Sequence, residues 1–129
     1  MDDAFVPQEG LIGDEGSGFA DVMHHCDFSR PALGLLCLGA AKASLYEAMA
    51  FATEREAFGQ PIMDYQNTKF VLAECKADVL AGKTLIDHCV QRCIGGNLDA
   101  ATASMAKLWA TEMQCKVVDK CLQIFGGYG

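Results

Sequence analysis

The chain has 129 residues, of which 51% are hydrophobic and 21% charged, and its length fits one domain. The apolar content excludes an intrinsically disordered chain, and 13 glycines and three prolines without a period exclude a collagen-like fibre. The formal charge of -7 leaves no basic face for bulk nucleic-acid binding. Since no uncharged apolar run reaches about 18 residues, we expect no membrane span.

The seven cysteines are odd in number, lie mostly inside helical patterns, and include no CxxC pair typical of a zinc site. No hydrophobic leader follows the acidic start of the chain, so we expect buried free thiols in a reducing compartment. That compartment is the cytoplasm, or the mitochondrial matrix in a eukaryote. His24, His25 and Cys26 are adjacent on a helical pattern and point in different directions, so no metal site is predicted.

Residues 1–15 are expected to be non-helical, with short extended segments at 5–6 and 11–12. After a short helix or first helical turn at 16–23, the first long helix should begin near Ser29 or Arg30. Ser29 is a suitable N-cap, and Pro31 fits the first turn because its missing N–H has no helical partner there. Gly59 and Pro61 follow the expected end of this helix near Arg55.

The second helix is predicted from about residue 62 or 64 to Ile94, and the third from an N-cap at Asp99 to about Phe125. Apolar residues three and four apart define a packing seam on the second helix: Leu72, Cys75, Val79, Gly82, Ile86, Cys89 and Cys93. The corresponding stripe on the third helix is Met105, Leu108, Cys115, Val118, Leu122 and Phe125.

Short connections between these helices predict an all-α, up-down-up bundle of three long helices preceded by a short non-helical lead. The first helix is apolar on every side, with Leu33, Leu36 and Leu45 pointing in different directions. A helix that is hydrophobic all round is buried all round. We therefore expect that a fourth helix is missing, that other chains cover the first helix, or both.

Three motifs carry functional information. They are Asp27-Phe28-Ser29-Arg30-Pro31, then Arg55-Glu56-Ala57-Phe58-Gly59-Gln60-Pro61-Ile62 followed by Gln66, and Gln123-Ile124-Phe125-Gly126-Gly127-Tyr128-Gly129. Each one alone is compatible with a helix cap or a helix-end charge. In this order and at these spacings they resemble the C-terminal helical domain of the acyl-CoA dehydrogenases. Ala106-Lys107 and the segment Val6 to Gly13, which is similar to the end of the family's middle β-domain, extend the match.

The resemblance divides the chain into 1–15, the end of the β-domain or a linker, and 16–129, a helical domain truncated before its last helix. It implies non-covalent FAD and a homo-oligomer, a dimer or tetramer, in which this domain contacts the FAD of a neighbouring subunit. The implied reaction is α,β-dehydrogenation of an acyl-CoA thioester, with electron-transfer flavoprotein as a candidate partner.

The resemblance also implies roles for individual residues. Arg55 would bind the FAD pyrophosphate, because a guanidinium fork suits phosphate, and Phe58 would lie against the cofactor. Gln66 would contact the adenosine half. Tyr65, next to it, stands at a position that is often His in the family and is a further candidate cofactor contact. The implied contacts to the ADP part are Gln123, Gly126 and Gly127, and Asp27 and Arg30 would lie near the acyl-CoA.

The catalytic glutamate of the family has no match here. In the medium- and short-chain types the glutamate follows the glycine-rich motif by a few residues. The matching position in this sequence would lie past Gly129. In the long-chain and isovaleryl types it occupies the position of Ser29, which cannot act as a base. We therefore expect an inactive fragment of a flavin-dependent dehydrogenase. The alternative is a structural or adaptor bundle that shares the fold without a working flavin site.

Overall fold

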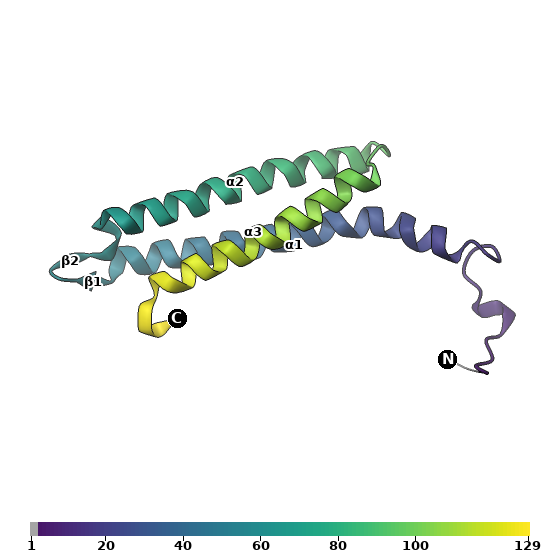
Figure 1. Ribbon diagram of the computed structural model, residues 1–129, viewed down its shortest axis with the longest axis horizontal. Helices are drawn as coiled ribbons and strands as arrows, with labels where there is room; N and C mark the ends of the chain where they lie inside the picture. Colours follow the sequence, from purple (N-terminus) through teal and green to yellow (C-terminus); the bar gives the residue numbers. More distant parts are fainter. Residues whose placement is uncertain (1–2) are drawn as a thin grey trace.

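The computed structural model describes residues 3–129 and consists of three long helices packed side by side (Figure 1). Helix α1 spans Gly18–Glu54, α2 spans Gln66–Ile94 and α3 spans Ala100–Ile124. Helix α2 runs back along α1, and α3 returns beside both, so the predicted all-α up-down-up bundle is confirmed (Figure 1). Three short 3-10 helices complete the described helical structure: η1 (Gln8–Gly10), η2 (Ile62–Asp64) and η3 (Gly126–Tyr128).

A small β-hairpin joins α1 to α2. Its strands, β1 (Glu56–Ala57) and β2 (Gln60–Pro61), pair antiparallel, with Glu56 opposite Pro61 and Ala57 opposite Gln60. They are the only strands within residues 3–129, so the extended segments expected at 5–6 and 11–12 remain unpaired. The exposed segment before α1 extends away from the bundle (Figure 1).

The prediction for the start of the first helix was wrong. Helix α1 begins at Gly18, eleven residues before Ser29, and Pro31 lies in its interior. The Ser29 hydroxyl donates to the Cys26 carbonyl, 3.4 Å away, instead of capping the helix. An interior proline costs about 3 kcal/mol because it removes one backbone hydrogen bond. Pro31 is buried, and we infer that its packing offsets this cost.

The other helix boundaries lie close to their predicted positions. The Asp99 carboxylate caps α3, with its Oδ1 accepting the Thr102 N–H at 2.8 Å. Helix α2 ends before Gly95, and Gly96 takes a positive φ of 66° in the turn. Both predictions rested on local chemistry, a side-chain cap and glycine, which acts over a few residues.

The predicted seam of α2 is buried from Leu72 to Cys89, with Cys93 only half-buried. The predicted stripe of α3 was wrong. Met105 and Leu108 are 58% and 66% exposed, Cys115 and Leu122 are also exposed, and Val118 and Phe125 are half-buried. The buried residues of α3 are Ala103, Ala106, Ala110, Met113, Val117 and Cys121. The predicted stripe favoured large apolar side chains, whereas half of the buried residues of α3 are alanines.

Helix α1 is buried along one side only. Its buried residues include Gly34, Ala41, Ala48 and Ala52, whereas Leu33, Leu35 and Leu36 are exposed. Within residues 3–129, helix α1 is therefore not covered on all sides. By length and composition α1 could cross a membrane, but the core helix of a soluble protein passes the same test. The uncovered apolar side is a surface that further protein would cover.

Gly34 and Gly39 offer a matched test of this packing. A Cβ added at Gly34 would overlap Cδ1 of the fully buried Ile86, whereas one added at Gly39 meets no atom within 4 Å. Alanine gains about 1 kcal/mol over glycine in a helix, and overpacking costs about 1–3 kcal/mol. Gly34→Ala should therefore lower the free energy of unfolding by up to about 2 kcal/mol, and Gly39→Ala should raise it. Urea unfolding measures both, and equal stabilisation would contradict tight packing at Gly34.

Candidate functional site

The turn of the hairpin holds Phe58 in a strained conformation. Phe58 and Gly59 form the two-residue turn with φ angles of 52° and 87°, the left-handed pair that antiparallel strands require. Glycine adopts this conformation freely, but a bulky residue does so at a cost. The Phe58 side chain is 100% exposed and gains no packing in return. A strained, exposed aromatic residue is a reason to look for function at this turn.

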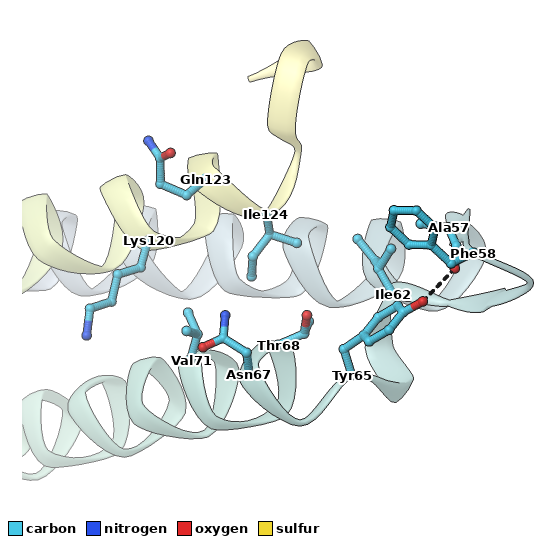
Figure 2. A pocket seen from close by; sticks show the side chains of 10 residues that line it. All are labelled: Ala57, Phe58, Ile62, Tyr65, Asn67, Thr68, Val71, Lys120, Gln123 and Ile124. Atoms are coloured by element: carbon cyan, nitrogen blue, oxygen red, sulfur yellow. Dashed lines mark hydrogen bonds between the residues drawn. The ribbon is translucent and has the colours of Figure 1, made fainter.

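Hydrogen bonds close the hairpin and connect it to the start of α2. The Tyr65 hydroxyl donates to the Ala57 carbonyl at 2.7 Å, as Figure 2 shows. The Ile62 N–H donates to the Arg55 carbonyl at 2.8 Å. The second bond closes the hairpin, and the first joins the hairpin to the residue that precedes α2.

The end of α3 packs beside the end of α1. The rings of Phe51 and Phe125 stack with centroids 4.5 Å apart, a separation typical of favourable aromatic pairs. Gly126 then takes a φ of 62° and the chain turns through η3. The turn places the Tyr128 ring 5.9 Å from the Arg55 guanidinium carbon. The glycine-rich motif thus meets the Arg55 motif in space.

A cavity of about 390 Å³ opens between the hairpin, the start of α2 and the end of α3. Its lining residues are Ala57, Phe58, Ile62, Tyr65, Asn67, Thr68, Val71, Lys120, Gln123 and Ile124 (Figure 2). The wall combines apolar side chains with two amides, two hydroxyls and a cation. Such a mixture is typical of sites for organic ligands.

All seven predicted cofactor residues lie at this end of the bundle. Phe58, Tyr65 and Gln123 line the cavity, and the Gln123 amide points away from α2 (Figure 2). Gln66, Gly126 and Gly127 are exposed beside it, but they do not line it. Arg55 is exposed and has no ion pair among residues 3–129.

Sequence reasoning missed four residues of this site: Asn67, Thr68, Lys120 and Tyr128. Asn67 and Thr68 directly follow Gln66 in the first turn of α2, and Tyr128 lies inside the glycine-rich motif. Their adjacency to named motif residues was a usable signal. Lys120 had no comparable signal, because its place depends on how α3 packs.

The two predicted substrate residues lie elsewhere. Asp27 and Arg30 form an ion pair of 2.9 Å, partly buried on α1. Asp27 lines a second cavity of about 290 Å³ with His24, Phe28, Cys93, Gly96 and Leu98. From Arg30 to Arg55 the helix rises about 40 Å. The two predicted sites are therefore at opposite ends of the three-helix bundle, far apart along α1.

A cluster of ion pairs joins α2 to α3 next to the first cavity. Lys116 lies 2.9 Å from Glu74 and 3.0 Å from Asp78, and Lys120 also pairs with Glu74. Hydrogen bonds from Lys120 and Lys116 lower the pKa of the Glu74 carboxyl to about 2. The bond to Glu74 likewise raises the pKa of Lys116 to about 12. The Glu74 carboxyl and the Lys116 ammonium are therefore both charged near neutral pH.

The cysteines do not contribute chemistry to the site. All seven are free, as expected, but Cys115 is exposed and Cys26 and Cys93 are only half-buried. Burial raises the pKa of the Cys121 thiol to about 11 and also raises that of Cys75. Because the thiolate is the reactive form, both thiols are inert near neutral pH. Residues 3–129 contain no cluster of three or more metal-ligating side chains.

The chain belongs to the acyl-CoA dehydrogenase family, since residues 16–129 match the model of "Acyl-CoA dehydrogenase, C-terminal domain". It is 33% identical over 129 residues to cyclohexane-1-carbonyl-CoA dehydrogenase from Geobacter metallireducens, covering 100% of this chain and 34% of that protein. It is equally similar, with the same coverage, to subunit CarC of the caffeyl-CoA reductase-Etf complex from Acetobacterium woodii. The crystal structure of an acyl-CoA dehydrogenase from Geobacillus kaustophilus superimposes with a TM-score of 0.94 and 32% identity, covering 98% of this chain and 33% of that one.

The chain spans about a third of the length of the curated relatives it matches. The match confirms the family and the helical-domain fold that the three motifs indicated.

Replacing Phe58 tests whether the turn is strained. Phe58→Asn puts a residue that tolerates the left-handed conformation at the turn, and it loses no buried contact because Phe58 is fully exposed. We expect the free energy of unfolding to rise by about 1 kcal/mol. Phe58→Ala, which keeps the backbone strain, is the control and should change stability little. Urea unfolding of both variants checks this, and stabilisation by Ala alone would contradict it.

The ion pairs of Glu74 with Lys116 and Lys120 predict that the stability of the bundle depends on pH. A carboxyl whose pKa is lowered on folding contributes stability above its unfolded value, near 4.5, and loses it as the pH falls toward about 2. Glu74→Gln should therefore lower the melting temperature at pH 7, and the difference from wild type should shrink below pH 4.5. Glu112→Gln, on the same helix as the two lysines and without an ion pair among residues 3–129, is the control. If the difference in melting temperature between Glu74→Gln and wild type did not change with pH, the ion pairs would not stabilise the bundle.

Proposed function

We propose that this chain is the FAD-contacting and subunit-contacting C-terminal domain of a flavin-dependent acyl-CoA dehydrogenase. The observation that supports this most is the hairpin end of the bundle. There Arg55 is exposed without an ion pair among residues 3–129, and the strained Phe58 ring projects fully into solvent beside it. The family match identifies the class of enzyme, and its members' reaction comes to this chain as part of the proposal.

The residues at this end fit the cofactor chemically. The Arg55 guanidinium suits the pyrophosphate, because its planar fork matches phosphate oxygens. Phe58 offers an apolar ring face, and the amides of Gln66 and Gln123, with the Tyr65 hydroxyl, offer polar contacts to the adenosine half. Gly126 and Gly127 have no atom within 4 Å of an added Cβ, so the backbone can be approached closely. When bound, FAD would accept the hydride from Cβ of the thioester.

The separation of the two sites supports an oligomer. Asp27 and Arg30, proposed to lie near acyl-CoA, are about 40 Å along α1 from Arg55. We therefore propose that α1 contributes residues to two different active sites. On this proposal, Asp27 and Arg30 serve the chain's own site, and the hairpin end serves the FAD of a neighbouring subunit. The exposed apolar side of α1 is available for the subunit contacts.

No residue of this chain is proposed as the catalytic base. The Ser29 hydroxyl donates to a backbone carbonyl, and the Asp27 carboxylate is paired with Arg30. The role proposed here for this domain is to bind and orient the substrate and cofactor. Electron-transfer flavoprotein is a proposed electron acceptor, since one relative is named as a subunit of an Etf complex.

Arg55 provides the test in the full-length protein. A charge-assisted hydrogen bond to phosphate contributes about 1.5–3 kcal/mol, so Arg55→Ala should raise the Kd for FAD about ten- to a hundredfold. Arg55→Lys should recover part of the affinity, because lysine lacks the fork. Titration of the apo-protein with FAD, followed by flavin fluorescence, measures each Kd.

The control is Arg92→Ala, which removes the same side chain at the opposite end of α2 and should leave the FAD affinity unchanged. An apo-protein that binds no FAD would favour the structural or adaptor bundle. FAD affinity that is equal in wild type and Arg55→Ala would overturn the pyrophosphate assignment.

A further inference from the structure

Tyr128 is the one aromatic residue that the structure places against the Arg55 guanidinium within residues 3–129. The Arg55 Cζ lies 5.9 Å from the ring centroid, within the range of a cation–π contact. The Tyr128 side chain is 79% exposed. It therefore adds little to the bundle core, and its contact with Arg55 is its main defined interaction.

The backbone around Tyr128 is fixed from two sides. The stacked rings of Phe51 and Phe125 join the last turn of α1 to the last turn of α3. On α1, the Arg55 N–H donates to the Phe51 carbonyl at 2.8 Å, and after α3 the Tyr128 N–H donates to the Phe125 carbonyl at 3.3 Å. The backbone of Arg55 is thus hydrogen-bonded to that of Phe51, and the backbone of Tyr128 to that of Phe125.

The geometry of a guanidinium explains what such a contact can do. Its five N–H donors lie in one plane and point outward from its edge. An aromatic ring against the flat face restricts the side chain without occupying these donors. Arg55 has no ion pair among residues 3–129 that would orient it in another way.

We propose that Tyr128 is a positioning residue that holds the Arg55 guanidinium over its ring, so that the N–H groups pointing away from the ring meet a cofactor phosphate. This inference rests on the proposed function, in which Arg55 binds the FAD pyrophosphate. The ring orders a flexible side chain before the ligand arrives and so lowers the entropic cost of binding.

A double-mutant cycle in the full-length protein tests the inference. Tyr128→Leu removes the ring and should raise the Kd for FAD about two- to fivefold, the scale of an exposed cation–π contact. Tyr128→Phe keeps the ring and should retain wild-type affinity. In an Arg55→Ala background, Tyr128→Leu should have no further effect on the Kd, because the group it positions is gone.

Each outcome bears on one of the two claims. If Tyr128→Leu weakens FAD binding equally in both backgrounds, the ring acts independently of Arg55 and the positioning role is wrong. If Tyr128→Leu leaves the Kd unchanged while Arg55→Ala raises it, the positioning role again fails and the proposed function stands. If Arg55→Ala itself has no effect, the pyrophosphate contact of the proposed function fails. Thermal unfolding without FAD should be the same for Tyr128→Leu and wild type.

Discussion

The close approach of α1 to α3 through small side chains is the constraint on which the rest of the structure depends. Fully buried alanines line both helices: Ala41, Ala48 and Ala52 on α1, and Ala103, Ala106 and Ala110 on α3. The distance between packed helices follows the size of the side chains at their contact. Alanines let the two helices run close together up to their C-terminal ends, where Phe51 and Phe125 stack. The stack in turn brings Arg55 and the glycine-rich motif to one place.

The same packing explains the apolar surface of the bundle. With small residues inside, larger ones such as Leu33, Leu36 and Leu108 are left outside. Exposed apolar area of this extent is typical of a protein interface. The chain covers about a third of the relatives it matches, and 98% of it superimposes on a third of the acyl-CoA dehydrogenase structure from Geobacillus kaustophilus. The outer apolar faces are therefore consistent with a domain that packs against further protein.

Features set by local chemistry could be predicted from the sequence, and features set by packing could not. The Asp99 cap and the glycine after α2 act over a few residues, and the three motifs indicated the family and the seven residues that gather at the hairpin end. The start of α1 was misjudged because Pro31 is a breaker by local rules, whereas its burial in the folded chain keeps it inside the helix. The left-handed conformation of Phe58 follows from the closure of the hairpin, which no propensity of phenylalanine indicates.

The contact between Arg55 and Tyr128 shows how local chemistry and packing combine. The two residues are 73 positions apart in the sequence and belong to different motifs. Each motif alone is compatible with an ordinary helix end. The alanine contact between α1 and α3 brings the two helix ends together, the ring stack fixes them, and the positive φ of Gly126 turns the chain back toward α1. The strained hairpin adds Phe58 at the same end of the bundle. The strained backbone of Phe58 and the positive φ of Gly126 are thus confined to turns. The helices that hold those turns in place are packed through residues with no proposed role in binding.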